Sequence, residues 1–187
     1  MNQFHKFCSI MKLIQYSRRI AKIACDHDDR GVLFNMKIAI GADHAGFRLK
    51  DDVVKFVESL GHEVTDVGCN CADSVDYPDY SVPVCEKVMS GEADRGILIC
   101  GTGIGMSIAA NKYPGIRCAL VHDTFSAKAT REHNDTNVLA MGERVIGPGI
   151  ALDIVGIWLG TAFSGNERHQ NRVNKITAIE QKHTLHP

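Results

Sequence analysis

The sequence has 187 residues, 44% hydrophobic and 23% charged, proportions typical of a single folded domain that exclude a disordered chain. Its formal net charge of -1 at pH 7 gives no global field for nucleic acid or an acidic membrane, so an anionic ligand needs locally placed cations. Seven cysteines at irregular spacing favour reduced thiols over a disulfide scaffold. Cys69 and Cys71 form a C-x-C pair, but no second pair follows at zinc-site spacing, so no metal site is expected.

The first 35 residues differ in composition from the rest of the chain. Up to Cys25 they hold five lysine and arginine side chains and no acidic one. A basic, acid-poor segment is typical of a targeting signal, but no cleavage signature is evident. We therefore expect a poorly ordered N-terminal extension over residues 1–35 of a cytoplasmic protein, with organellar targeting as the alternative. An apolar strand pattern begins directly after Met36, and we assign residues 36–187 to one domain.

From Lys37 onward, short apolar runs alternate with longer stretches of helical spacing. The expected strands are 37–40, 63–67, 96–100, 117–121 and 138–141, and the expected helices are 47–60, 104–110, 125–133 and 150–163. This alternation predicts an α/β fold with a parallel sheet and helices on both faces. Ligands of such open sheets bind beyond the carboxyl ends of the strands, which is where functional residues are expected.

Asp43 and His44 follow the first expected strand, immediately ahead of the first expected helix. Asp43 alone is explained as the N-cap of that helix. His44 is harder to explain by structure, because a helix start gains nothing from a cation. A functional acid–imidazole pair and a simple helix cap are both open at this point.

The third expected strand brings Cys100 to the same edge of the sheet, where the glycine-rich turn 101–105 and a helix follow. Glycines allow several backbone N–H groups to converge on one oxyanion, and the helix start adds partial positive charge, which also favours a thiolate. Cysteine is, however, often a small buried hydrophobic residue. The turn also resembles a dinucleotide-binding fingerprint, although Met106 stands where the third glycine would be.

Polar and basic clusters lie further along the chain. His133 precedes the last expected strand and can move protons near neutral pH, although histidine is also common at helix ends. Arg144 follows that strand at its carboxyl end. Arg168 and Arg172 are four residues apart and share a helix face, where two guanidiniums suit a phosphate dianion. The alternative for this arginine pair is a solvated helix face.

Together these segments resemble the type B ribose-5-phosphate isomerases over about residues 37–181. The related galactose-6-phosphate isomerases share the Cys-Gly-Thr-Gly turn but alter or lack the HND and RHQ segments, which are intact here. Some type B members use a glutamate base, whereas Cys100 places this chain in the cysteine-base group. The N-terminal extension departs from the family pattern. The matching segments are GADHAGF at 41–47, DYP at 76–78, GILICGTGIGMSIAANK at 96–112, HNDTNVLAMGERV at 133–145 and RHQNRV at 168–173.

The resemblance implies a three-layer α/β/α sandwich with a five-stranded parallel Rossmann-like sheet. It implies interconversion of D-ribose 5-phosphate and D-ribulose 5-phosphate through a cis-enediolate, in the non-oxidative branch of the pentose phosphate pathway, without cofactor or metal. It also implies a homodimer or dimer of dimers with active sites shared across the dimer interface, and no nucleic-acid or membrane partner. The implied catalytic residues are Cys100 (base), His133 (ring opening), Asp43 and Thr102, and the implied substrate-binding residues are Asp43, His44, Gly101, Thr102, Gly103, Ile104, Gly105, Asn134, Arg144, Arg168 and Arg172.

Two other functions compete with this interpretation. One is isomerisation of a hexose 6-phosphate, such as allose or galactose 6-phosphate, because the depth of a pocket is not visible in one sequence. The other is a non-catalytic phosphate- or nucleotide-binding domain built on the same glycine turn. Such a binding module has no need for the Cys100 thiol and the His133 imidazole beside an anion site.

Overall fold

The structure is a computed structural model that describes residues 35–183. The α/β class and the all-parallel five-stranded sheet are confirmed, with strand order β2-β1-β3-β5-β4. The strands are β1 (Lys37–Ala42), β2 (Glu63–Asp66), β3 (Arg95–Cys100), β4 (Cys118–Leu120) and β5 (Val138–Gly142). The helices are α2 (Phe47–Ser59), α3 (Pro78–Ser90), α4 (Ile104–Ala110), α5 (Thr124–Asn134), α6 (Pro148–Gly160) and α7 (Glu167–His183).

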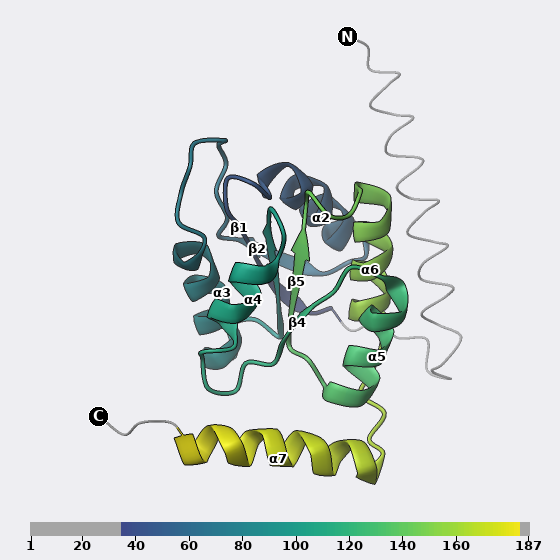
Figure 1. Cartoon of the computed structure of the whole chain (residues 1–187). Helices are drawn as coiled ribbons and strands as arrows, with labels where there is room; N and C mark the ends of the chain where they lie inside the picture. The colour runs from purple at the N-terminus through teal and green to yellow at the C-terminus, as the bar shows by residue number, and fades with distance from the viewer. Residues whose placement is uncertain (1–34, 184–187) are drawn as a thin grey trace.

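The helices cover the sheet in two layers (Figure 1). One hydrophobic cluster joins β1, β3 and β5 to α2, α5 and α6, with Phe56 and Trp158 fully buried in it. The other joins the opposite face of the same strands to α3 and α4 around Val84, Leu98 and Met106. Alternate residues of each central strand thus supply opposite cores, which is why these strands are apolar throughout.

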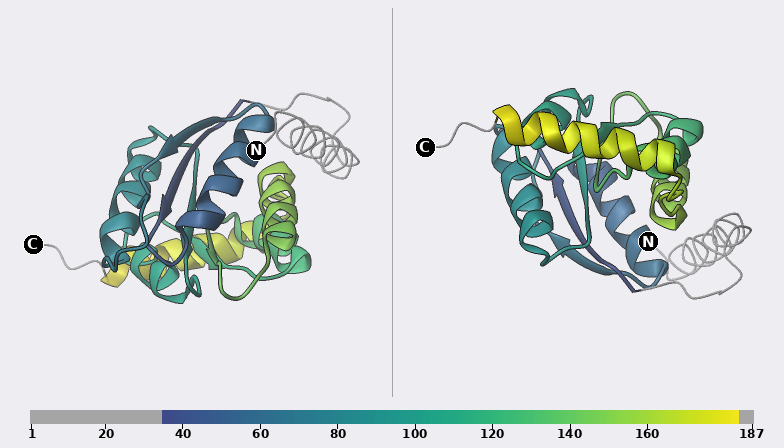
Figure 2. Two further views of the ribbon diagram at one scale, coloured as in Figure 1. Left: turned by 90° about the horizontal axis from the view of Figure 1, so that it is seen from above. Right: turned by 90° about the horizontal axis from the view of Figure 1, so that it is seen from below.

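The α7 helix belongs to neither layer. It crosses the amino-terminal edge of the sheet, below the strands in Figure 1 and in front of them in the right-hand view of Figure 2. The Glu180 carboxylate accepts a hydrogen bond from the Gly115 N–H at 2.8 Å, and the Glu132 carbonyl accepts one from the Ser164 N–H at 3.2 Å. These contacts attach the helix and its leading loop to the amino edge.

The strand order creates a switch point between β1 and β3. The chain leaves β1 to form β2 on one side and returns to form β3 on the other, so the loops that follow β1 and β3 diverge. In the β1–β3 register, Ala42 pairs with Ile99, which brings the carboxyl ends of the two strands level. Open parallel sheets bind their ligands at such a crevice.

The helix α3 was not predicted. The segment 78–90 was given no structure from its sequence, but it forms α3. Pro78 occupies the first turn of that helix, where no intrahelical N–H is needed, and Gly91 ends it in the left-handed conformation. Pro83 lies inside the helix and removes one backbone hydrogen bond, and burial of Val84 and Cys85 against the sheet offsets that loss.

Residues 1–34 of the expected extension fall outside the described residues, and none of the described helices is long and apolar enough to cross a membrane. We predict that residues 36–187, expressed alone, fold with a melting temperature within about 5 °C of the full chain. The reason is that β1 begins at Lys37 and both core clusters are assembled from residues that follow it. Differential scanning calorimetry of the two proteins measures the difference. Aggregation of the shorter protein, or a much larger drop, would show that the extension belongs to the folded unit.

Candidate active site

Asp43 and His44 lie in the loop that follows β1, at the switch point. The Asp43 N–H donates to the Ile99 carbonyl at 3.2 Å, which joins this loop to the end of β3. The Asp43 carboxylate is almost buried and accepts from the Ala45 N–H at 2.8 Å. It does not cap α2, whose N-cap is Gly46, and the Glu143 carboxylate instead accepts from the Leu49 N–H in the first turn. The cap interpretation of Asp43 is therefore wrong, and its carboxylate is held at the site by the loop itself.

His44 is presented in a defined tautomer. Its Nδ1 accepts a hydrogen bond from the Val75 N–H at 3.2 Å. A backbone N–H can only donate, so Nδ1 carries a lone pair and the proton of the neutral ring lies on Nε2. His44 therefore offers an N–H donor to a ligand in the crevice.

Cys100 is the last residue of β3, and the glycine turn folds back over its sulfur. The Gly103 N–H donates to Cys100 Sγ at 3.0 Å. Gly103 has φ 76°, and a Cβ there would lie 2.5 Å from Leu120 Cδ1 and 2.8 Å from the Met141 carbonyl carbon, so only glycine fits. A backbone donor aimed at the sulfur stabilises negative charge on it.

The turn also keeps donors available beyond the sulfur. Within the described part of the chain, no group accepts a hydrogen bond from the N–H groups of Gly101, Thr102 or Gly105. The Arg144 N–H donates to the Gly101 carbonyl at 3.0 Å, which fixes the turn against the end of β5. The Tyr77 ring packs on Gly105, where a Cβ would come within 2.6 Å of it. The turn is thus held by contacts on two sides, and three of its N–H groups remain available as donors.

His133 and Asn134 end α5, and Arg168 and Arg172 lie in the first turns of α7. The His133 and His169 rings are in contact, with centroids 4.4 Å apart and planes tilted by 46°. His169 Nε2 lies 3.3 Å from an Arg168 guanidinium nitrogen, and because arginine only donates, His169 Nδ1–H must donate to Ser164 Oγ at 2.8 Å.

The residues around His133 and His169 form a cationic cluster. Burial lowers the pKa of His169, and the nearby His133, Arg168 and Arg172 lower it further. A pocket of about 390 Å³ opens on this side of α7, lined by Glu167, Arg168, Asn171, Arg172 and Lys175. Three cationic side chains against one carboxylate suit a phosphate dianion.

Within one chain, the residues around Cys100 and the residues around His133 do not lie together. Cys100 pairs with Gly142 at the carboxyl ends of β3 and β5, whereas Gly96 pairs with Val138 at their amino ends. The chain from His133 reaches β5 at Val138, so His133 lies at the amino edge. Four strand residues, about 13 Å along the sheet, separate the edges. The predicted residues thus form a carboxyl-edge cluster (Asp43, His44, Cys100, Gly101, Thr102, Gly103, Ile104, Gly105 and Arg144) and an amino-edge cluster (His133, Asn134, Arg168 and Arg172).

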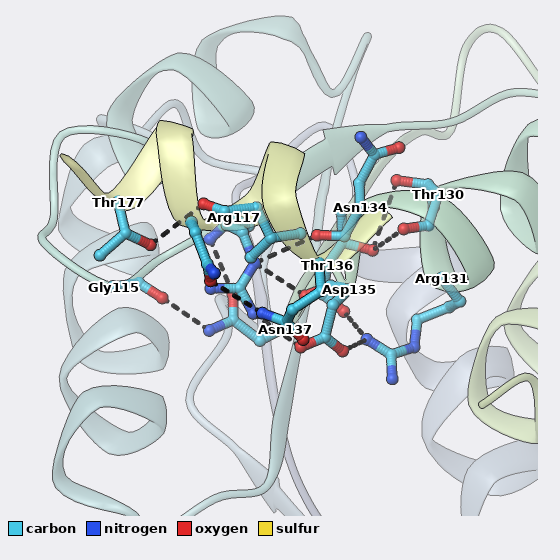
Figure 3. Close-up of polar contacts among 12 residues, drawn as sticks. Gly115, Arg117, Thr130, Arg131, Asn134, Asp135, Thr136, Asn137 and Thr177 are labelled. Carbon is cyan, nitrogen blue, oxygen red and sulfur yellow. Dashed lines mark hydrogen bonds and ion pairs between the residues drawn. The ribbon is translucent and has the colours of Figure 1, made fainter. Parts of the chain in front are cut away.

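Figure 3 shows the polar network that holds the end of α5. Asp135 follows His133 and Asn134 with φ 48°, the only positive φ of a non-glycine residue among those described. Its carboxylate accepts from Arg131 at 2.8 Å and from Arg117 at 3.0 Å. Arg117 Nε also donates to the Asn134 and Asp135 carbonyls at 3.2 and 2.9 Å. Burial lowers the pKa of Arg131, and the Asp135 charge opposes that effect.

The sequence analysis assigned no role to four residues near the two clusters. Tyr77 belongs to a matching segment but was given no role, and it packs on the turn. His122 follows β4, and its Nε2 lies 3.3 Å from the Thr102 carbonyl, so the strand-end rule applied to β4 would have found it. Glu143 and His169 support α2 and the cationic cluster through contacts that no local pattern reveals. Among residues 35–183, no three His, Cys, Asp or Glu side chains gather as a metal site.

Comparison with known proteins assigns the fold and site to a class. The Ribose/Galactose Isomerase family matches residues 38–176. YwlF of Bacillus subtilis is 64% identical over 79% of this chain and 99% of its own. Ribose-5-phosphate isomerase B of Escherichia coli is 52% identical over 78% of this chain and 97% of its own. The structure of Clostridium thermocellum ribose-5-phosphate isomerase B matches with a TM-score of 0.78 and 54% identity, covering 80% of this chain and all of that one.

Two further matches carry information on ligands. The Mycoplasma genitalium ribose-5-phosphate isomerase B, solved with bound ribulose-5-phosphate, matches with a TM-score of 0.74 and 37% identity, covering 78% of this chain and 97% of that one. A D-erythrulose-4-phosphate isomerase of Pectobacterium atrosepticum is 44% identical over 70% of this chain and 86% of its own. The fold and these matches thus define a sugar phosphate isomerase. The chain belongs to the ribose/galactose isomerase family, in its type B ribose-5-phosphate isomerase group.

The Asp135 network leads to a prediction about stability. We expect Asp135→Asn to lower the free energy of unfolding by about 2 kcal/mol, because it leaves the nearly buried Arg131 without its carboxylate. Asparagine also tolerates the left-handed backbone, so the substitution isolates the charge. The control is Glu132→Gln, which breaks the exposed Lys128–Glu132 pair three residues earlier, within α5, and should cost less than about 0.5 kcal/mol. Urea unfolding of both variants measures the difference, and equal losses would refute the assigned role.

Proposed function

We propose that this protein interconverts D-ribose 5-phosphate and D-ribulose 5-phosphate. The observation that carries the proposal is the placement of Cys100 Sγ beneath the Gly103 N–H, at the switch point that also holds Asp43 and His44. The names of the Escherichia coli and Clostridium thermocellum relatives, and the ribulose-5-phosphate bound in the Mycoplasma genitalium structure, support the choice of a pentose phosphate.

The proposed reaction begins with the cyclic aldose, which must be opened. His133 donates a proton to the ring oxygen while a base removes the proton of the anomeric hydroxyl, and Asp43 is the proposed second group. The Cys100 thiolate then takes the proton from C2, and negative charge develops on the carbonyl oxygen as the enediolate forms. A hydroxyl proton also passes from O2 to O1, and Cys100 returns its own proton to C1, so one base on one face of the cis-enediolate completes the transfer between the two carbons.

The glycine turn supplies the electrostatic part of this proposal. The N–H groups of Gly101, Thr102 and Gly105 are available to the developing oxyanion, and the loss of one such donor typically costs about 3–4 kcal/mol of transition-state stabilisation. The His44 Nε2–H can donate to a substrate hydroxyl, since its Nδ1 is engaged by the Val75 N–H. These donors are held in place before the substrate binds and need no reorganisation.

We further propose that the complete site forms between two copies of the chain. The phosphate-binding arginines and His133 lie at the opposite edge of the sheet from Cys100, so the amino-edge cluster of one copy must face the carboxyl-edge cluster of the other. Apolar side chains left exposed around the turn offer a surface for that contact. They are Ile104, Ile108, Leu120 and Phe125, from α4, β4 and the start of α5, with exposed fractions of 50%, 57%, 38% and 80%.

The candidate substrates differ in the number of carbon atoms of the sugar. The match to a D-erythrulose-4-phosphate isomerase shows that a related chain acts on a shorter sugar, and hexose 6-phosphates are the longer alternative. All of these substrates need the same thiol base and anion turn and differ in the distance from C2 to the phosphate. The arginine pair on α7 would select by that distance.

We predict that the purified protein isomerises ribose 5-phosphate at a kcat/KM at least about tenfold above its values for D-erythrulose 4-phosphate and for allose and galactose 6-phosphates. The measurement is a coupled assay of all four substrates. Cys100→Ala should reduce kcat by at least about 1,000-fold because it removes the base. The matched control is Cys118→Ala on β4, which should leave the rate nearly unchanged. A Cys100→Ala variant with near-normal kcat would remove Cys100 from the mechanism, and preference for another sugar would correct the substrate.

The shared site makes a separate prediction. Cys100→Ala and His133→Asn proteins, each nearly inactive alone, should regain about a quarter of the unmodified activity when subunits are unfolded and refolded together in equal amounts. Half of the resulting dimers are mixed, and each mixed dimer holds one site with both native residues. Refolding each variant with itself is the control. Mixed samples no more active than these controls would place Cys100 and His133 in the same chain's site.

A further inference from the structure

Cys69 and Cys71 form a close thiol pair that the proposed reaction does not use. They follow β2 on the segment that leads to α3, and their sulfurs lie 3.4 Å apart. Cys69 is nearly buried and Cys71 is exposed, and both are unpaired. Lys50, fully buried, donates from Nζ to Asn70 Oδ1 and to Asp66 Oδ2, both at 2.6 Å, and so fixes the residue between the two cysteines.

The two thiols are not equivalent. The Cys71 N–H donates to Cys69 Sγ at 3.4 Å, and this contact lowers the pKa of the Cys69 thiol, with a further contribution from the Cys71 side chain and against the effect of burial. The hydrogen bond with Cys69 raises the pKa of Cys71. A thiol of lowered pKa in contact with a second thiol is an arrangement that favours disulfide formation.

We propose that Cys69 and Cys71 are a redox modification site, a reversible disulfide whose formation lowers the isomerase activity; the effect on activity rests on the proposed function. The oxidant is a hydroperoxide. The thiolate form of one cysteine of the pair attacks a peroxide oxygen, and the O–O bond breaks. The products are a sulfenic acid and, once the leaving alkoxide takes up one proton, an alcohol. The second thiol then attacks the sulfenic sulfur, forming the S–S bond and releasing water. Two thiols and one hydroperoxide thus give one disulfide, one alcohol and one water.

The cysteine segment is tied directly to the carboxyl-edge cluster. The Cys69 N–H donates to the Ala42 carbonyl at 2.8 Å, one residue before Asp43. Four residues beyond Cys71, the Val75 N–H fixes the tautomer of His44. Tyr77, two residues further, packs on the Gly105 backbone of the anion turn. One short segment therefore sets the positions of three parts of the site.

A disulfide would shift that segment. Its sulfurs bond at about 2.0 Å, so the present separation must close by about 1.4 Å. The Cys71 N–H contact with Cys69 Sγ and the Cys69 thiol contact with the Cys71 carbonyl at 3.2 Å would be lost or remade. Because a misplacement of about 1 Å can cost up to about 100-fold in rate, a shift passed to His44 and Tyr77 should be visible in kcat/KM.

In the test, the full-length protein is treated with hydrogen peroxide, and the thiols that remain are then blocked. Cleavage before aspartate releases residues 66–72, which contain Cys69 and Cys71 and no other cysteine. We expect this peptide to lose about 2 Da, and a dithiol to restore its mass. In parallel, kcat/KM should fall at least about tenfold and recover with the dithiol. The variant Cys71→Ser changes an exposed side chain, and Cys85→Ser is the matched control outside the pair.

The outcomes separate the possibilities. Cys85→Ser should respond as the unmodified protein does, and Cys71→Ser should keep most of its activity at the same dose. Absence of the 2 Da loss in the 66–72 peptide overturns the modification site, whatever the activity. A disulfide without any change in kcat/KM overturns the control of activity. Equal loss in Cys71→Ser assigns the inactivation to Cys100. If the reduced protein isomerises none of the sugar phosphates, the proposed function fails, and the peptide mass still decides the disulfide.

Discussion

Parallel pairing of β1 with β3, and of β3 with β5, is the constraint on which the site depends. The registers Ala42–Ile99 and Cys100–Gly142 end the three strands at one level. The loops that follow must then share one crevice, and the Asp43 N–H bond to the Ile99 carbonyl closes the gap between two of them. A thiol at the end of the middle strand is flanked by an acid and an imidazole on one side and by Arg144 on the other.

The same constraint places the second cluster out of reach. A helix that follows a parallel strand runs back across the sheet, so its last residues lie at the amino edge. His133 and Asn134 are the last residues of α5, and α7 meets them there. A two-fold axis makes each contact occur twice, so if the carboxyl edge of one copy faces the amino edge of another, both sites are completed together. The direction of the helices therefore explains why, in the proposed function, each copy supplies a different part of the site.

Part of this arrangement could be predicted from the sequence, and part could not. Asp43, His44 and Cys100 were found because strand-end residues of an open sheet share an edge, an argument that needs only the strand assignments. His133 and the α7 arginines were grouped with them by family resemblance, since local spacing does not show which edge a residue occupies. Segment 78–90 was missed because its two prolines obscure the helical pattern. The bond from Val75 to His44 joins residues 31 positions apart, and no motif contains both.

The charges of the two clusters differ in how they are balanced. At the amino edge, Arg117 and Arg131 share Asp135, which leaves their net positive charge only partly compensated. Burial and then the charge of Arg131 lower the pKa of neighbouring Arg95 to about 10, whereas the charges of Asp135 and Asp94 oppose that shift. Arg168 and Arg172 add further positive charge on α7. In the proposed function, a phosphate dianion bound by Arg168 and Arg172 would offset part of this positive charge. At the carboxyl edge the donors are uncharged amides and the His44 Nε2–H, which suit a charge that exists only while the enediolate does. In the proposed reaction, the permanent charge of the substrate and its transient charge are thus matched by different kinds of groups, and the length of the sugar between them decides whether both can be met at once.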